Sequence, residues 1–166
     1  MDKTARNKWV RRTVEVLVIM AVIFTARAYQ HRDLPTGPAP PLQGVLLDGT
    51  SFNLAEFNGR PVLVYFWATW CAICKLEQGT IAAIARDHRV ITVAMQSGVK
   101  YEVKRHLSKN GLEFPVLNDQ DGRRAASWGV RGVPTSFIVD GEGKIHFTEV
   151  GYTTEAGLRA RLWLTR

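Results

Sequence analysis

The sequence predicts an α/β domain with a mixed β-sheet, and three observations lead to that prediction. Short runs of β-branched and aromatic residues alternate with longer stretches whose apolar residues recur at helical spacing. Two of the short runs, residues 62–67 and 90–95, enclose one of these stretches, which is the pattern of a β-α-β unit. Near the C-terminus, two strand-like runs flank the turn sequence DGEG at 140–143, which indicates an antiparallel hairpin. Parallel and antiparallel pairing are therefore expected in one sheet.

The elements of this domain can be placed from their apolar patterns. Residues 62–67 are apolar throughout, as expected for a central strand that is covered on both faces. Residues 72–86 repeat their apolar positions at helical spacing, and residues 90–95 form a second buried strand. A helix is predicted at 101–110, and Gly111 is a good left-handed cap for its C-terminal end. The remaining elements are predicted as helices at 125–128 and 155–164 and as strands at 114–117, 135–139 and 144–150.

Length and composition exclude several classes of protein. The chain has 166 residues, enough for one ordinary domain and an extension but not for two large domains. Hydrophobic residues make up 46% and charged residues 22%, which fits neither a disordered chain nor a protein with many membrane spans. The formal net charge is +7, but residues 1–28 carry +4 of it and the other 138 residues contain no basic run. A nucleic-acid partner is therefore not expected.

The N-terminal segment has the charge pattern of an export signal. Five lysines and arginines precede residue 13, and residues 16–26 carry no charge. This order predicts that the N-terminus stays inside the cell and that the domain is periplasmic or otherwise extracytoplasmic. A helix over 13–26 would rise about 21 Å, less than the roughly 30 Å of a hydrocarbon core, so its length leaves two outcomes open. The segment stays in the inner membrane as an anchor, which we favour, or it is cut as a signal peptide at Ala26-Arg27-Ala28.

Composition divides the chain into three parts. Residues 1–28 form the signal anchor or signal peptide. Residues 29–41 contain four prolines and no apolar period, which predicts a tether. Residues 42–166 form the folded domain, and no repeat or further low-complexity tract divides it.

The two cysteines, Cys71 and Cys74, carry the strongest chemical signal. They are the only cysteines of the chain, and they follow a buried strand and open a helix. Unpaired backbone N–H groups at a helix N-terminus stabilise an anion, so Cys71 is predicted to be the nucleophilic thiolate. Cys74 lies within one turn on the buried side, where it can attack a mixed disulfide formed at Cys71. The pair itself serves as the redox-active disulfide, and no further cofactor is expected.

Three other uses of the cysteine pair compete with catalysis. A structural disulfide that closes four residues would contribute only about 2 kcal/mol, whereas one that closes a 100-residue loop gives about 4.7 kcal/mol. A zinc site needs about four ligands, and the four histidines are scattered without ligand spacing. Copper binding is harder to dismiss, since thiolates suit Cu(I), although the three methionines form no cluster. A copper-binding chaperone therefore stays the alternative function.

Several segments together resemble the thioredoxin superfamily. They are FWATWCAICK, FPVLND, WGVRGVPTSFIVD and EGKI, and the likeness covers residues 42–163. More closely, the chain resembles membrane-tethered thiol-disulfide oxidoreductases of the TlpA/ResA/DsbE type, and its YFWATWC segment resembles the suppressor-for-copper-sensitivity D proteins. The resemblance implies a thioredoxin-like fold, with an N-terminal β-hairpin and a helix-containing insertion before Pro134. It also implies that Pro134 is cis and faces the cysteines, and that Val133 presents backbone groups to a substrate peptide.

The same resemblance implies an activity and partners. The protein is expected to reduce protein disulfides outside the cytoplasm and to be re-reduced by a membrane thiol electron-transfer protein. A monomer is expected, because no added domain or coiled-coil seam offers a dimer interface. Oxidase and isomerase activities stay open, since about 30 mV in reduction potential already corresponds to about 1.4 kcal/mol. The predicted substrate-binding residues lie around the nucleophile and on the proline loop, and are Trp70, Ala72, Ile73, Val133 and Pro134.

The chain departs from the superfamily pattern at two positions, one of which is Gly79, where relatives commonly bend the helix with a proline. Six residues before Cys71, thioredoxins place a buried aspartate that helps to move the proton of the second thiol, and this chain has Tyr65. Tyr65 and Trp67 are predicted to be core residues. The nearest helix carboxylate, Glu77, is expected to face solvent, and Lys75 is expected to be a solvated charge.

Overall fold

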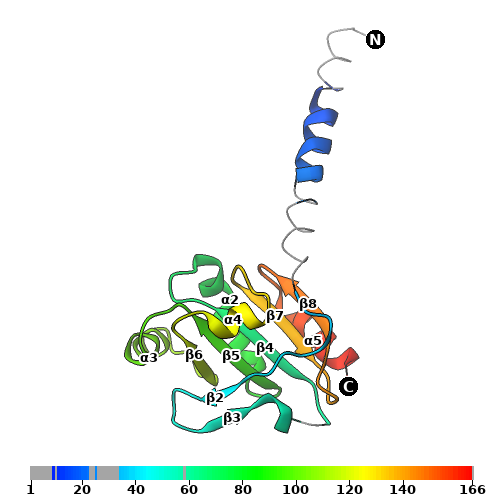
Figure 1. The fold of residues 1–166 in the computed structure, drawn as a ribbon. Coiled ribbons are helices and arrows are strands. Elements are labelled where there is room, and N and C mark those ends of the chain that lie inside the picture. The colour runs from blue at the N-terminus through cyan, green and yellow to red at the C-terminus, as the bar shows by residue number, and fades with distance from the viewer. Residues whose placement is uncertain (1–8, 10, 23–24, 26–33, 58, 166) are drawn as a thin grey trace. The chain divides into compact units, whose positions relative to one another are not determined.

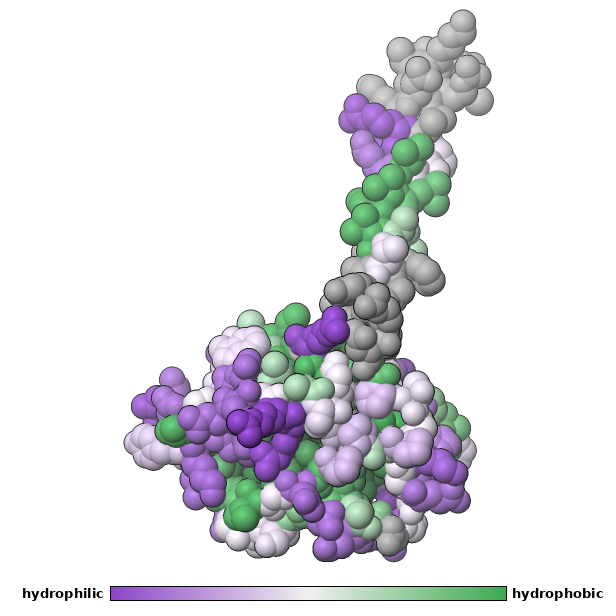
Figure 2. Space-filling model, viewed as in Figure 1, coloured by the Kyte–Doolittle hydropathy of each residue, from purple (hydrophilic) through white to green (hydrophobic). Residues whose placement is uncertain are grey.

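The computed structural model describes residues 9, 11–22, 25, 34–57 and 59–165 of the chain. The chain divides into two compact units, residues 1–33 and Leu34–Arg166. Residues 11–22 of the first unit are helical, and most of their exposed side chains are apolar (Figure 2). Across the described residues, no helix is both long enough and apolar enough to span a membrane. The expected cleavage motif at residues 26–28 lies outside the described part.

A six-stranded sheet forms the centre of the second unit, with helices against both of its faces (Figure 1). A separate two-stranded hairpin and a short 3-10 helix precede the first central strand, so the expected N-terminal hairpin is confirmed. The strands are β1 (Gly37–Pro38), β2 (Gln43–Val45), β3 (Ser51–Asn53), β4 (Val62–Trp67), β5 (Arg89–Met95), β6 (Val116–Asp119), β7 (Thr135–Val139) and β8 (Lys144–Val150). The helices are η1 (Leu54–Glu56), α2 (Ala72–Ile84), α3 (Lys100–Lys109), α4 (Arg123–Ser127) and α5 (Glu155–Leu164).

The sheet is mixed, as the sequence predicts, and its strand order is β1-β8-β7-β4-β5-β6. β4 pairs in parallel with β5, and β5 with β6, so the helix α2 between β4 and β5 completes a β-α-β unit. β7 pairs antiparallel with both β4 and β8, and β1 adds an antiparallel strand at the outer edge. β4 therefore has a partner on each side, which confirms its expected central position.

The side chains of β4 alternate between two hydrophobic cores. Its odd-numbered residues, which include Tyr65 and Trp67, point into one core together with residues of α2, α3 and α5. Its even-numbered residues, which include Phe66, point into the other core, formed with α4, β7 and the N-terminal hairpin. All six side chains of the strand are at most 1% exposed. The unbroken apolar run of this strand therefore follows from burial on both faces.

Part of the expected tether is folded against the domain. β1 lies within it and pairs with the start of β8. Leu34 and Ala39 also pack against the hydrophobic core. The compact unit therefore begins at Leu34, eight residues before the boundary expected from the proline content. Prolines and glycine at this outer edge are compatible with a strand of two residues, because an edge strand needs few backbone donors.

The strand predicted at 114–117 lies two residues later, as β6. Pro115 has no N–H with which to join the ladder, and pairing with β5 begins at Val116. The carbonyl oxygen of Pro115 still takes part, since it accepts the N–H of Thr92 at 2.9 Å. The proline thus stands at the entrance of the strand rather than within it.

The helix predicted at 125–128 begins earlier, at Arg123, where a buried carboxylate holds its first turn. Asp119 is fully buried at the end of β6. Its Oδ1 accepts the N–H of Arg124 at 3.0 Å, and its Oδ2 accepts the N–H of Ala125 at 2.9 Å. The first N–H groups of a helix have no acceptor within the helix itself. The Asp119 carboxylate therefore joins the end of β6 to the start of α4.

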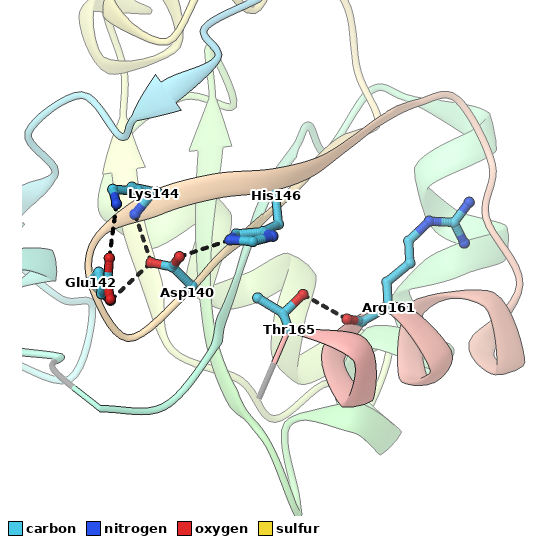
Figure 3. Close-up of polar contacts among 6 residues, drawn as sticks. All are labelled: Asp140, Glu142, Lys144, His146, Arg161 and Thr165. Atoms are coloured by element: carbon cyan, nitrogen blue, oxygen red, sulfur yellow. Dashed lines mark hydrogen bonds and ion pairs between the residues drawn. The ribbon is translucent and has the colours of Figure 1, made fainter.

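The turn between β7 and β8 is also held by a carboxylate (Figure 3). Asp140 Oδ1 accepts the backbone N–H groups of Glu142 and Lys144, each at 2.8 Å. Asp140 Oδ2 lies 2.8 Å from Nε2 of His146. Burial raises the pKa of Asp140, but these hydrogen bonds outweigh it, so the pKa lies below its ordinary value. The first residue of the DGEG sequence thus closes the predicted hairpin.

We expect Asp119→Ala to lower the free energy of unfolding by about 2 kcal/mol, because two N–H groups at a buried helix start lose their acceptor. Urea denaturation followed by circular dichroism measures the change. Asp121→Ala is the matched control, since the Asp121 carboxylate is 55% exposed and pairs with Arg123 at the surface. Its expected loss is below about 1 kcal/mol. Equal losses in the two variants would contradict the capping role of Asp119.

Candidate functional site

Cys71 and Cys74 lie where the central strand β4 is followed by helix α2. Cys71 is the N-cap of α2, with an extended backbone at φ −81° and ψ 111°. The two cysteines form a disulfide, and their Cα atoms are 5.3 Å apart. The N–H of Cys74 donates to Sγ of Cys71 at 3.0 Å. The helix start therefore supplies a hydrogen bond that also stabilises the Cys71 thiolate once the disulfide is reduced.

Exposure distinguishes the two sulfurs. Cys71 exposes 6% of its surface and Cys74 exposes none. Cys74 instead packs in the core with Tyr65 and Trp67. Of the two cysteines, Cys71 alone keeps some solvent exposure, which is the asymmetry of an attacking and a resolving thiol.

The loop before β7 reaches the cysteines from a distant part of the sequence. The Val133–Pro134 peptide bond is cis, as the resemblance implies. The carbonyl oxygen of Val133 lies 3.5 Å from Sγ of Cys71, and the two residues are 62 positions apart in the chain. Pro134 is buried, whereas Val133 is partly exposed. Val133 therefore forms part of the surface beside the reactive sulfur.

Trp70, Ala72 and Ile73 are exposed beside the cysteine pair. Trp70 exposes 60% of its surface, yet its indole Nε1 donates to the carbonyl oxygen of Gln96 at 3.1 Å. The ring is thus held in place while its faces stay open. Among the residues predicted to contact substrate, these three and Val133 are accessible around Cys71.

Glu77 is buried, so the expectation that it faces solvent is wrong. It lies one turn after Cys74 on the inner face of α2, and both residues are fully buried. Its Oε1 accepts the N–H of Thr153 at 2.9 Å, whereas its Oε2 has no hydrogen-bond partner in the described part of the chain. Burial raises the pKa of Glu77, and the N–H of Thr153 and the nearby hydroxyl of Tyr65 offset this only in part. A carboxyl group that can take up a proton therefore lies one helical turn after the resolving cysteine, on the same buried face of α2.

Tyr65 stands next to this carboxyl and is a core residue, as predicted. Its side chain is fully buried, and its hydroxyl makes no hydrogen bond of good geometry with any described residue. Burial and the charge of Glu77 raise the pKa of Tyr65, so the phenol stays protonated. Positions 74, 77, 81 and 84 recur at helical spacing and are all buried. This spacing is the sequence signal that predicts the burial of Glu77.

The chemistry available at the site is that of two sulfurs and one buried carboxyl. Lys75 is exposed, as expected for a solvated charge. Within the described residues, no group of three or more histidine, cysteine, aspartate or glutamate side chains is arranged to hold a metal ion. A dithiol in this position exchanges with a disulfide by transfer of two electrons, through a mixed disulfide on the accessible sulfur.

Comparison with known proteins gives the same chemistry. The family model for Redoxin matches residues 33–162. A thioredoxin-like protein of Haemophilus influenzae is 34% identical over 119 residues, which cover 70% of this chain and 71% of the relative. A thiol:disulfide interchange protein DsbE of Allochromatium vinosum is 32% identical over 143 residues, which cover 81% of this chain and 79% of the relative.

Solved structures with the same fold confirm the thioredoxin-like architecture. A thioredoxin-family thiol:disulfide interchange protein from Chlorobium tepidum superposes with a TM-score of 0.68 at 26% identity, over 80% of this chain and 98% of that one. An exposed lipoprotein thioredoxin from Streptococcus pneumoniae superposes with a TM-score of 0.64 at 28% identity, over 75% of this chain and 98% of that one. The chain therefore belongs to the redoxin family, as a thiol-disulfide oxidoreductase of the thioredoxin-like type.

Proposed function

We propose that the protein reduces protein disulfides outside the cytoplasm, through a mixed disulfide on Cys71 that Cys74 resolves. The observation that carries this proposal is the placement of the pair, with Cys71 slightly exposed at a helix start and Cys74 fully buried behind it. The charge pattern of residues 1–28 supports export, with this segment as the anchor in the cytoplasmic membrane. The similarity to an exposed lipoprotein supports the same location.

Reduction begins when the Cys71 thiolate attacks one sulfur of the substrate disulfide. An S–S bond forms between Cys71 and that sulfur, the substrate S–S bond breaks, and the second substrate sulfur leaves as a thiolate that takes a proton. Cys74 then gives up its proton and attacks the Cys71 sulfur, which releases the first substrate sulfur as a thiolate that is protonated in turn. The substrate gains two electrons and two protons, and the protein is left with its disulfide closed.

The surface around Cys71 binds the polypeptide that carries the substrate disulfide. Val133 is partly exposed with its carbonyl beside the sulfur, so an extended substrate can pair with this stretch of backbone. Trp70 and Ile73, which are exposed next to the cysteine pair, offer apolar surface to the same substrate. Because the indole of Trp70 is already fixed by Gln96, it loses little freedom when a substrate binds.

Glu77 receives the proton of Cys74 in the resolving step. Burial disfavours a thiolate at Cys74, so the second attack needs a nearby base. The Oε2 of Glu77 lies on the same buried helix face and has no hydrogen-bond partner in the described part of the chain. The raised pKa of this carboxyl brings it closer to that of a thiol, which favours proton transfer between the two.

The oxidised protein needs two electrons before it can act again. We assign their supply to a membrane thiol electron-transfer protein, whose thiolate attacks Sγ of Cys71 and releases Cys74, which takes up a proton. A second thiol of that protein then attacks its own mixed-disulfide sulfur and releases Cys71. The donor is oxidised by two electrons, and the same accessible sulfur serves both half-reactions. A monomer is sufficient for this cycle.

We expect Cys74→Ser to trap substrates on Cys71, because serine cannot release the mixed disulfide. The variant, produced in its native compartment, should give disulfide-linked adducts on non-reducing gels, and mass spectrometry should identify the linked proteins. The double variant Cys71→Ser/Cys74→Ser is the control and should give none. A trap that stays empty would contradict the exchange reaction.

Copper binding is the alternative use of the same two thiols, and one pair of measurements separates it from exchange. The full-length reduced protein in detergent is titrated with Cu(I) against a competing chelator, beside a disulfide-reduction assay on insulin. Insulin reduction at catalytic protein concentrations supports the oxidoreductase proposal. Tight stoichiometric Cu(I) binding without insulin reduction would overturn it in favour of a copper chaperone.

Glu77→Gln should slow the release of a mixed disulfide by at least about tenfold, because the amide cannot accept the proton of Cys74. The Oε1 of glutamine can still accept the N–H of Thr153, so the helix contact is kept. Rapid mixing of the reduced protein with a disulfide peptide, quenched with acid and analysed by mass spectrometry, measures formation and release separately. The rate of formation at Cys71 should stay unchanged. A slowing confined to formation would contradict the role of Glu77.

Glu77→Gln should also remove a pH dependence of stability. Because the pKa of Glu77 is raised in the folded state, protonation of this carboxyl favours folding. This stabilisation is complete below the ordinary pKa of 4.5 and is lost as the pH rises through the folded-state pKa. With both proteins in the disulfide form, the free energy of unfolding of the wild type should therefore fall relative to that of Glu77→Gln as the pH is raised from acidic to neutral. Urea denaturation at several pH values measures the difference, and a constant difference would contradict the prediction.

A further inference from the structure

An open groove runs from the two residues that precede Cys71 to the surface of α3. Its volume is about 640 Å³, and Thr69 and Trp70, which directly precede Cys71, line one end of it. The loop 96–98, after β5, forms one side of the groove. Arg105, His106 and Lys109 of α3 form the other side, where the surface is mostly hydrophilic (Figure 2). A chain bound in this groove would therefore carry its neighbouring residues to the reactive sulfur.

The groove has two exposed cations on its α3 side. Arg105 and Lys109 are four positions apart, so they lie on the same face of the helix. Neither forms an ion pair with a carboxylate of the described residues. The Arg105 guanidinium contacts an aromatic ring instead, with 5.9 Å to the ring centre of Tyr101. Their charges are therefore available to a ligand.

Other groups in the groove offset this positive charge only in part, because one carboxylate faces two cations. Glu102 is the one carboxylate among the described lining residues, and its Oε2 accepts the N–H of Val99 at 2.9 Å, which holds it at the start of α3. His106 shares a hydrogen bond of 3.0 Å between its Nε2 and Oε1 of Gln78. Burial and then the charges of Lys75 and Lys109 lower the pKa of His106 below 6.5. The field of two lysines therefore reaches the groove.

We propose that this groove selects substrates by binding an acidic segment of the substrate protein, whose carboxylates pair with Arg105 and Lys109 while the flanking disulfide meets Cys71. The inference rests on the exchange reaction proposed above and names the class of substrate for it. Complementary charge raises the rate of encounter and favours one orientation of the bound chain. A lysine-rich segment would be repelled from the same place.

The test uses two short peptides, each closed by one disulfide and identical except that one has aspartates and the other has lysines beside the disulfide. The reduced full-length protein in detergent is mixed with each peptide, and acid quenching with mass spectrometry gives the second-order rate constants. We expect the acidic peptide to react about tenfold faster, which corresponds to two exposed ion pairs. The preference should shrink as sodium chloride is added, because salt screens exposed charges.

Charge reversal at the groove should invert the preference. Arg105→Glu/Lys109→Glu should slow the acidic peptide and speed the basic one. Arg60→Glu/Arg86→Glu makes the same change in net charge before the starts of β4 and β5, whereas the groove lies beyond the ends of these strands. This control should keep the wild-type preference, and circular dichroism checks that both variants fold.

The outcomes separate the inference from the proposed function. The uncharged probe 2,2′-dithiodipyridine reports whether the wild-type thiols react with any disulfide. Equal rates with the two peptides, or a preference that salt leaves unchanged, would overturn the role of the groove and leave the exchange reaction standing. No reaction with either peptide or with the probe would overturn the exchange reaction, and the inference with it. If the control variant also inverted the peptide preference, the effect would come from net charge alone, and this too would overturn the proposal that the groove selects substrates.

Discussion

The position of the reactive sulfur depends on the burial of β4 on both faces and its pairing on both edges. The strand is fixed by two cores, and Cys71 follows its end by four residues. On one edge, Phe66 is paired with Thr135 of β7, so the register brings the Val133 carbonyl to the sulfur. On the other edge, β5 is paired in register with β4, and the chain after it supplies the carbonyl of Gln96 that holds Trp70. One strand therefore positions both sides of the site.

Elements whose residues are contiguous in the sequence could be predicted from their apolar spacing and turn residues. The central strand, the helix after it and the β7–β8 hairpin were all predicted from apolar spacing and from turn residues such as Asp140. The start of β6 was missed by two residues, because Pro115 enters the strand without joining its ladder. The start of α4 was missed because it depends on Asp119, a carboxylate of the preceding strand. Both errors concern boundaries that are set outside the element itself.

The site was predictable only where its residues are close in sequence. The cysteine pair could be interpreted alone, whereas the approach of Pro134 depends on strand register and was expected only from the resemblance. Glu77 was assigned to solvent because charged residues are usually exposed. The helical spacing of Glu77 with Cys74 and Ile81 does indicate its burial, whereas its hydrogen-bond partner, the N–H of Thr153, lies 76 positions away and could not be foreseen. The folded part of the tether was missed for the same reason, because it is held by pairing with β8, which is distant in the sequence.

Binding and chemistry use different elements of this fold. The cations proposed to select substrates stand exposed on α3, where water and salt weaken their influence on distant groups. The carboxyl proposed to serve Cys74 is buried on the inner face of α2, where burial raises its pKa. Substitutions on α3 can therefore change which proteins are reduced while the resolving step stays the same. Changes in the core around Glu77 would instead alter how fast any bound substrate is released and leave the choice of substrate unchanged.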